Sequence, residues 1–245
     1  MDKKRDEKVA IVTGASKGIG KAISIELAGY GCYVVVNYNS DEYGASQTLE
    51  TIRSAGGDGE IMKFDVSNLD QTQNTIGDIS SRFKTIDILV NNAGITADEL
   101  FVMMTQDKWK SVIETTLNGF YNVTKPVIEK MLLVKNGSIV SIASVAGIMG
   151  NRGQANYSAA KAGLIGASRV VASEVARLGI RVNVVAPGLI NTGMIKDAPV
   201  VNIKTLIPMA RIGEPEEVAK VVRFLCSEDA TYITGQVISV NGGMF

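Results

Sequence analysis

Histidine is absent from this chain. The commonest general acid or base is therefore unavailable, and any proton transfer must use other side chains. Cysteine is scarce: Cys32 and Cys226 are the only two, and their separation matches no metal-binding spacing. We therefore expect no metal site and two reduced thiols in the core. No run of apolar residues approaches the ~18 that a membrane-spanning helix needs.

An excess of charge of either sign is also missing. Lys plus Arg number 25 and Asp plus Glu number 25, so the chain has no basic field for nucleic acid and no polybasic patch for a membrane surface. The charged start, MDKKRDEK, lacks the apolar stretch and small-residue cleavage site of a signal peptide. We expect a cytoplasmic protein that binds neither nucleic acid nor a membrane.

What is present is a regular alternation of short β-branched runs with longer helical patterns. The 245 residues are 46% hydrophobic and contain no linker-like stretch. We therefore expect a single domain that spans residues 1–245. The alternation predicts a Rossmann-type α/β fold, a doubly wound parallel sheet with helices on both faces. The predicted strands are 8–13, 33–37, 60–65, 87–91, 137–143, 180–186 and 236–240, and the predicted helices are 19–30, 41–55, 69–83, 106–133, 156–178 and 215–226.

Two long stretches, 94–105 and 187–214, break this alternation. Both follow the carboxyl ends of predicted strands, where open α/β sheets bind their ligands. Connections of this length in a compact domain are usually binding loops or lids. We expect residues 190–214 to form a substrate lid.

A glycine-rich turn, TGASKGIG, lies between the first predicted strand and the first predicted helix. Gly14 permits a tight turn, Gly18 lets the backbone approach a pyrophosphate, and Gly20 lets the helix pack close to the strand. The helix start then offers free N–H groups to the phosphates. In this strand–turn–helix context the motif predicts a dinucleotide site. Its turn residues are Gly14, Ala15, Ser16, Lys17, Gly18, Ile19 and Gly20.

The end of the second strand bears on which dinucleotide binds. Sites that prefer NAD place an acid there, against the ribose 2′-hydroxyl. This chain has Asn37, which would not repel a 2′-phosphate, and Lys17 in the turn supplies a nearby cation. Lys17 could instead be a solvated loop lysine. Together, Asn37 and Lys17 favour NADPH, with NADP as its oxidised form.

Other residues at the same edge of the sheet extend the predicted site. Asp65 could accept from the adenine amino group or cap the helix that starts near Asn68, and the two roles are compatible. Small residues after the fourth strand leave room for the ribose, and Pro187 ends the sixth strand beside the expected nicotinamide. These positions add Asp65, Val66, Asn92, Ala93, Gly94, Pro187, Gly188, Ile190 and Thr192 to the predicted cofactor site.

Tyr157 and Lys161 lie four residues apart in an alanine-rich segment, so a helix puts both side chains on one face. A phenol has an unperturbed pKa of about 10, and a nearby ammonium lowers that pKa. Such a pair can deliver a proton to a substrate oxygen near neutral pH. Without further context, the same spacing also describes an ordinary Tyr–Lys pair on a helix surface.

Five motifs in a fixed order supply that context: TGASKGIG, NNAG, Ser144, YSAAK and VNVVAPG. By them, the chain resembles the short-chain dehydrogenase/reductase family over essentially its whole length. More narrowly, GIMGNRGQANYSAAKAGLIG, NVVAPGLI and YITGQVISVNGGM look like the β-ketoacyl-[acyl-carrier-protein] reductases of bacterial fatty-acid synthesis.

This resemblance implies a role for each catalytic candidate. Tyr157 would protonate the substrate carbonyl, and Lys161 would hold the nicotinamide ribose and lower the tyrosine pKa. Ser144 would hydrogen-bond the carbonyl and stabilise the developing charge. NADPH would give a hydride to the keto carbon of a 3-oxoacyl chain carried by acyl carrier protein. The implied substrate-binding residues are Ser144, Gln154 and Tyr157.

The sequence departs from the family at two places. An Asn that commonly anchors a relay water in the long helix before the fifth strand is replaced by Thr116. Asn118 lies about 200° further around a regular helix and would face elsewhere. Of two basic positions that meet the carrier in the family, Lys135 matches one, whereas the other reads Leu178 beside Arg177. These departures suggest a paralogue that serves a dedicated chain, such as a polyketide or polyene.

Two other functions stay open. The same fold could act on another ketone or secondary alcohol, such as an acyl-CoA, a steroid or a sugar. Thr116 would also suit a catalytically weak dinucleotide-binding scaffold.

The predicted helix 156–178 indicates self-association. It is apolar or small over more than one face, which is too much for packing on the sheet alone. Its small residues would let another helix approach closely, and helix 106–133 could join the same interface. We expect a homotetramer, as the resemblance also implies. The small residues are Ala155, Ala159, Ala162, Gly163 and Gly166.

Overall fold

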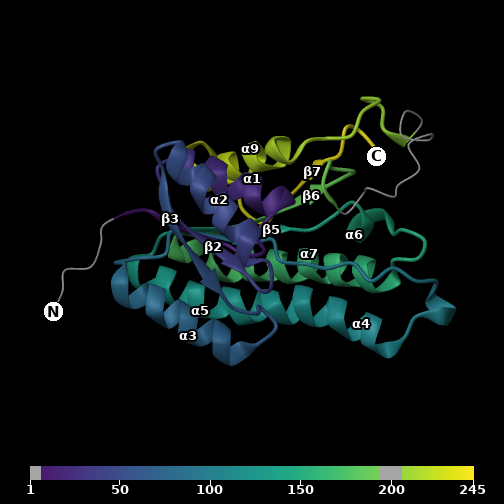
Figure 1. Cartoon of the computed structure of the whole chain (residues 1–245), viewed down its shortest axis with the longest axis horizontal. Helices are drawn as coiled ribbons and strands as arrows, with labels where there is room; N and C mark the ends of the chain where they lie inside the picture. The colour runs from purple at the N-terminus through teal and green to yellow at the C-terminus, as the bar shows by residue number, and fades with distance from the viewer. Residues whose placement is uncertain (1–6, 194–205) are drawn as a thin grey trace.

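The strands pair into one parallel sheet in the order β3-β2-β1-β4-β5-β6-β7. The computed structural model describes residues 7–193 and 206–245, and Figure 1 shows helices on both sides of this sheet. The Rossmann-type α/β prediction is therefore confirmed. The strands are β1 (Val9–Val12), β2 (Tyr33–Tyr38), β3 (Asp58–Lys63), β4 (Ile88–Asn91), β5 (Gly137–Ile142), β6 (Ile180–Pro187) and β7 (Val237–Val240).

Two helical layers bury opposite faces of the sheet. Ala10 and Val12 of β1 face one core and Val9 and Ile11 face the other, because side chains alternate along a strand. Helices α1 (Gly18–Gly29), α2 (Glu42–Ser54) and α9 (Pro215–Cys226) cover the first core, and α3 (Leu69–Arg82), α5 (Gly119–Val134) and α7 (Ala155–Val175) cover the second. Burial on both faces explains the continuous apolar runs.

The helix predicted over 106–133 is not regular. Helix α4 (Gln106–Ile113) is followed by a π-helical turn, Glu114–Asn118, before α5 begins. A π turn changes the direction of the side chains around it, so the angular argument about Asn118 does not apply. Single π turns occur frequently at functional sites. The shorter helical segments are η1 (Phe101–Met103), α6 (Ala146–Met149), η3 (Ala176–Leu178) and η6 (Glu228–Ala230).

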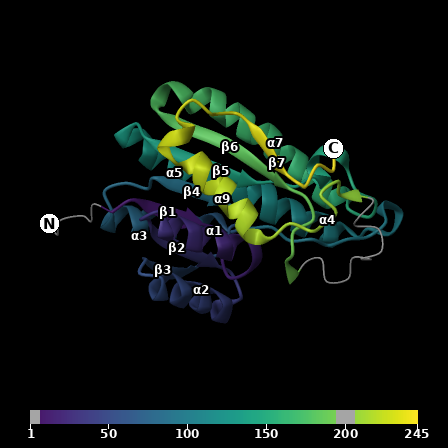
Figure 2. The ribbon, with the colours of Figure 1, turned by 90° about the horizontal axis from the view of Figure 1, so that it is seen from above.

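The strand order reverses between β1 and β4, which are neighbours although two strands separate them in sequence. A crevice forms beyond the carboxyl ends of the strands at such a point, and ligands bind there in open α/β sheets. Figure 2 shows this arrangement from above, with β1 and β4 central in the sheet. The glycine-rich turn and the segment after β4 both start at this edge.

Both cysteines lie in the core that α1 and α9 cover. They are free thiols, and burial raises the pKa of Cys32 to about 11 and that of Cys226 to about 12. Among residues 7–193 and 206–245, no helix is long and apolar enough to span a bilayer. The same residues hold no cluster of His, Cys, Asp and Glu side chains suited to a metal ion.

Candidate active site

The glycine-rich turn is held in place by the neighbouring strand β2. The amide of Gly14 donates to Asn37 Oδ1 at 3.0 Å, and the amide of Ala15 donates to the Asn37 carbonyl at 2.8 Å. Gly14 has a φ of 62°, and a Cβ there would lie 2.9 Å from Ala93 Cα. Glycine is therefore required at this position both for its backbone conformation and for space.

The segment after β4 holds the turn from the other side. Asn92 Nδ2 donates to the carbonyls of Thr13 and Gly14 at 2.8 and 2.9 Å. The Thr13 hydroxyl accepts from the amides of Asn92 and Ala93 at 2.9 and 3.0 Å. Asn92 therefore acts on the turn through its side chain. Thr13 was not among the predicted site residues, although a threonine between a strand and a glycine turn is a detectable signal.

The side chain of Asn37 is directed toward the glycine-rich turn. Its side chain is 2% exposed, and Nδ2 donates to the carbonyl of Phe64 at 2.9 Å, with longer bonds to two neighbouring carbonyls. With Oδ1 bonded to Gly14, the side chain faces the turn and has no group left for a ribose. Asn39 and Ser40 are the first exposed residues after β2.

The start of α1 fits a phosphate group. Lys17 is exposed at the N-cap and its side chain makes no capping bond, so the first-turn amides keep their donors for a ligand. A Cβ on Gly18 would come within 3.3 Å of Thr192 Cγ2, which places Thr192 against the turn. A Cβ on Gly20 would overlap the Gly14 carbonyl. Glycine alone fits this cradle.

The remaining turn residues play supporting parts. Ser16 donates from its hydroxyl to the Asp41 carbonyl at 2.8 Å, Ala15 is buried, and Ile19 packs against the core beside α1. The turn therefore offers mainly its backbone and Lys17 to a dinucleotide.

Asp65 lies two residues beyond β3 and organises the loop before α3. Its Oδ1 accepts from the amide and the hydroxyl of Ser67, and its Oδ2 accepts from Asn39 at 3.2 Å. The cap of α3 is Asn68, which accepts from the Gln71 amide at 3.0 Å. The capping alternative for Asp65 is therefore wrong.

Val66 is fixed by the first turns of α5. A Cβ on Gly119 would lie 2.8 Å from Val66 Cγ2, and Asn122 Nδ2 donates to the carbonyls of Val66 and Ser67 at 2.9 and 3.1 Å. Helix α5 thus supports the loop where the adenine is expected.

The structure brings together three residues from distant parts of the sequence. The Tyr157 hydroxyl lies near enough to the Ser144 side chain for Ser144 to influence its pKa, and Ser144 Oγ accepts from the Ala146 amide at 3.1 Å. Lys161 Nζ lies 5.6 Å from the centroid of the Tyr157 ring and donates to the Ile142 carbonyl at 2.7 Å. A Cβ on Gly94 would lie 3.3 Å from Nζ, so the segment after β4 reaches the same place.

The protonation of Tyr157 differs from expectation. Burial raises its pKa, the hydrogen bond from Ser144 opposes this, and the charge of Asp98 adds to the rise. Lys161 is 3% exposed, and burial lowers its pKa to about 8. The expectation that Lys161 lowers the tyrosine pKa is not met, because its ammonium is directed to the Ile142 carbonyl. Tyr157 is a protonated phenol at neutral pH and is suited to donate.

Gln154 and Thr116 occupy different surroundings. Gln154 Nε2 donates to Asp98 Oδ2 at 2.8 Å, and its Oε1 accepts from Asn151 at 3.0 Å, so the side chain joins two loops beside α7. Thr116 lies in the π turn, 3% exposed, and its hydroxyl has no hydrogen-bond partner among the described residues. A buried hydroxyl without a protein partner is unusual.

The end of β6 borders the same site. The Val145 amide donates to the Pro187 carbonyl at 2.9 Å, so Pro187 lies beside the segment that begins at Ser144. The Gly188 amide donates to the Val240 carbonyl at 2.9 Å, and Ile190 forms a bridge with Gly213. Of the predicted lid, residues 194–205 lie outside the described residues, so the lid stays a prediction.

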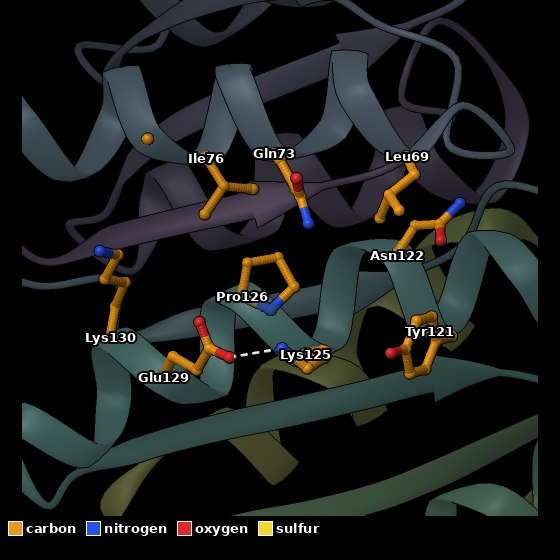
Figure 3. Close-up of a pocket in the computed structure, with 10 residues that line it drawn as sticks. Leu69, Gln73, Ile76, Tyr121, Asn122, Lys125, Pro126, Glu129 and Lys130 are labelled. Carbon is orange, nitrogen blue, oxygen red and sulfur yellow. Dashed lines mark hydrogen bonds and ion pairs between the residues drawn. The ribbon is translucent and has the colours of Figure 1, made fainter.

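Two cavities are lined by residues of the helices and strands described above. One, of about 350 Å³, takes in Ile190 together with residues of α9 and β7. The other, of about 240 Å³, lies between α3 and α5, as Figure 3 shows. Asn122 lines it beside Leu69 and Tyr121, whereas no predicted catalytic residue does. The second cavity therefore touches the support of the adenine loop rather than Tyr157.

Comparisons with known proteins agree with this geometry. A family model described as enoyl-(acyl carrier protein) reductase matches residues 14–245. A 3-oxoacyl-[acyl-carrier-protein] reductase from Synechocystis is 48% identical over 237 residues, 96% of each chain. Proteins of the same name from Pseudomonas aeruginosa and Staphylococcus aureus are 45% and 43% identical, over 97% of this chain and 97% and 98% of theirs. The chain belongs to the short-chain dehydrogenase/reductase family.

Proposed function

We propose that this protein reduces a 3-oxoacyl thioester to the 3-hydroxyacyl thioester with NADPH. The observation that carries the proposal is that Tyr157 and Ser144 lie close together, with Lys161 buried beside them. Two hydroxyl groups at one point suit a ketone oxygen that gains negative charge and then a proton. The names of the relatives support a 3-oxoacyl group as the source of that ketone.

The raised pKa of Tyr157 fits the direction of reduction. A phenol that stays protonated at neutral pH donates its proton to the substrate oxygen as charge develops there. Ser144 supplies a second hydrogen bond to the same oxygen. Lys161, with a pKa of about 8, is mostly charged at pH 7, and we propose that it holds the nicotinamide ribose.

The dinucleotide would be held by the turn at Gly14–Gly20, with Lys17 and Thr192 flanking it. When bound, it supplies the hydride that reduces the carbonyl carbon. We propose NADPH because Lys17 places an exposed cation at the phosphate end of the site. Asn37 no longer contributes to this choice.

We propose that Thr116 holds a water molecule. Its hydroxyl is buried and unpartnered among the described residues, and the π turn loosens the regular ladder of carbonyls around it. A hydroxyl with a neighbouring carbonyl can hold one water. Such a water would return protons to Tyr157 in place of the amide that the family uses.

Acyl carrier protein is the proposed carrier of the substrate. Lys135 ends α5, and Gly179 packs against its carbonyl, so Lys135 and Arg177 lie at one end of the molecule. An acidic carrier would find two cations there. The helical path from Tyr157 to Arg177 is about 30 Å. A carrier bound there would therefore have to present its acyl chain over that distance.

We also propose that the protein forms a homotetramer. Ala159, Ala162, Gly163 and Gly166 are exposed along one face of α7, and Val170 continues it at 57% exposure. A face of small and apolar side chains lets a second helix approach closely.

Initial rates on four substrates test the function. NADPH oxidation is followed with acetoacetyl-carrier protein, acetoacetyl-CoA, crotonyl-carrier protein and a steroid ketone. The proposal predicts the highest kcat/KM for the acetoacetyl-carrier protein. A higher value for the crotonyl thioester would favour enoyl reduction, which the matching family description names. No turnover with any ketone, together with tight NADPH binding, would indicate a dinucleotide-binding scaffold.

A further inference from the structure

Asn156, immediately before Tyr157, is fully buried near the start of α7. Its Nδ2 donates to the carbonyls of Ala97 and Lys108, both at 3.0 Å. Its Oδ1 accepts from the Tyr157 amide at 2.8 Å. Both donor hydrogens and the acceptor of this amide are therefore used, and each reaches a different segment of the chain.

The bond to the Tyr157 amide replaces a missing cap. The first amides of a helix have no partner within the helix, and an N-cap side chain usually accepts from one of them. Here the N-cap residue, Gln154, makes no such bond. Asn156 provides it from inside the first turn, so the orientation of Tyr157 depends on this side chain.

Further bonds connect the segment after β4 with the start of α7 and with α4. The Glu99 amide donates to the Gly153 carbonyl at 2.8 Å, Lys108 Nζ lies 2.9 Å from Glu99 Oε2, and Gln154 bonds to Asp98. Among the residues whose side chains make these contacts, Asn156 alone is fully buried. Figure 1 shows α4 running beside the start of α7, where these bonds occur.

We propose that Asn156 is a positioning residue that fixes Tyr157 against the segment that follows β4. This inference rests on the proposed role of Tyr157 as proton donor. The segment after β4 carries Gly94, which lies against Lys161, and Asp98, whose charge acts on Tyr157. Asn156 therefore sets the position of Tyr157 relative to Lys161 and to Asp98.

Two other buried asparagines serve as matched controls. Asn122 also bridges two carbonyls, those of Val66 and Ser67, but on the adenine side of the site and at the cavity of Figure 3. Asn183 on β6 donates to the Ile233 carbonyl and accepts from the Gln236 amide, away from all predicted site residues. Comparing substitutions of the three residues therefore distinguishes the positioning of Tyr157 (Asn156) from support of the cofactor loop (Asn122) and from general stability (Asn183).

Steady-state kinetics, NADPH binding by fluorescence and thermal unfolding are measured for Asn156→Ala, Asn122→Ala and Asn183→Ala. Asn156→Ala should lower kcat by about 10- to 100-fold, as expected when a catalytic group moves by about 1 Å, while the NADPH Kd stays within about twofold of the wild type. Asn122→Ala should raise the NADPH Kd with a smaller change in kcat. Asn183→Ala should lower only the unfolding temperature.

A second variant covers a failure of Asn156→Ala to fold. Asn156→Ser keeps an oxygen that can accept from the Tyr157 amide but cannot span the carbonyls of Ala97 and Lys108. Its kcat should fall by an intermediate amount. The positioning role is wrong if Asn156 variants raise the NADPH Kd and keep kcat, or if Asn183→Ala lowers kcat equally.

Hydrogen exchange separates this inference from the proposed function, because it needs no substrate. In the Asn156 variants, exchange should rise together in peptides covering 95–104 and 155–160, and stay unchanged around 65–70. A rise confined to 155–160 would contradict the link between the segments. If the exchange result holds and no ketone is reduced, the proposed function fails while the link stands.

Discussion

The side-chain oxygen of Asn37 accepts a 3.0 Å hydrogen bond from the backbone amide of Gly14. Through this bond, a residue near the end of β2 shapes the glycine-rich turn that follows β1. The side-chain nitrogen of Asn37, Nδ2, donates to the carbonyl of Phe64, the residue just beyond β3. Asn37 therefore ties three strand ends together.

Asn37→Asp should destabilise the protein and leave the cofactor preference unchanged. The carboxylate cannot donate to the Phe64 carbonyl and would be buried at 2% exposure. We expect a loss of about 2–4 kcal/mol in the free energy of unfolding. Denaturant titration measures the loss, and kcat/KM is compared for NADPH and NADH. A shift toward NADH by tenfold or more would show that the residue does face the ribose.

Lys17→Ala should reduce the preference for NADPH. Lys17 is exposed at the start of α1, and a cation there is attracted to a 2′-phosphate. The ratio of kcat/KM for NADPH over NADH should fall by about tenfold, the equivalent of about 1.4 kcal/mol. Lys21→Ala, on the same helix, is the control. An unchanged ratio in Lys17→Ala would place the selecting residue elsewhere.

Lys161 should make the stability of the protein depend on pH in the alkaline range. Its pKa is lowered by burial from 10.5 to about 8, so between these values the unfolded chain binds a proton that the folded chain has released. The free energy of unfolding therefore rises as the pH increases from about 8 to 10.5.

Lys161→Met removes this titration. The difference in free energy of unfolding between wild type and Lys161→Met should change by about 3 kcal/mol across the window, in favour of the wild type at high pH. Chemical unfolding at several pH values measures it. A difference that is flat with pH would mean that the folded-state pKa of Lys161 is not lowered.

Thr116→Val removes a hydroxyl and keeps the shape of the side chain. Because that hydroxyl has no hydrogen-bond partner among the described residues, stability should change by less than about 1 kcal/mol. If the hydroxyl holds a relay water, kcat should fall several-fold with an unchanged NADPH Kd. An unchanged kcat would mean that Thr116 only packs.

Thr116→Asn introduces the longer amide that the family uses and should be neutral or mildly activating. A large loss of kcat in this variant would show that the π turn, Glu114–Asn118, directs residue 116 differently from its relatives.

The fold was accessible from sequence because most strands are short runs rich in apolar residues that alternate with helical patterns, although β3 (Asp58–Lys63) contains three charged residues. The π turn was not, because a shift in the backbone hydrogen-bond ladder leaves no periodic signal in five residues. The orientation of the Asn37 side chain could not be predicted for a related reason: at a strand end, a one-residue change of register turns a side chain to the other face.

The candidate site likewise contains residues that the sequence pattern predicts and residues that only the folded structure reveals. Tyr157 and Lys161 share a helix face by spacing alone, and the glycine turn has a known local geometry. Asn156 gave no such signal, since a buried asparagine in a helix is recognised only by the carbonyls it reaches, and these belong to residues 97 and 108. The pKa of Tyr157 could not be predicted either, because burial depends on the whole fold.

The most direct test of the account is the kcat of Tyr157→Phe for reduction of acetoacetyl-carrier protein, with NADPH binding measured in parallel. The phenol hydroxyl is the proposed proton donor, so its removal should lower kcat by about 10²–10⁴-fold while the NADPH Kd stays within about threefold of the wild type. Retention of more than a tenth of the wild-type kcat would contradict the account, because another group would then be delivering the proton.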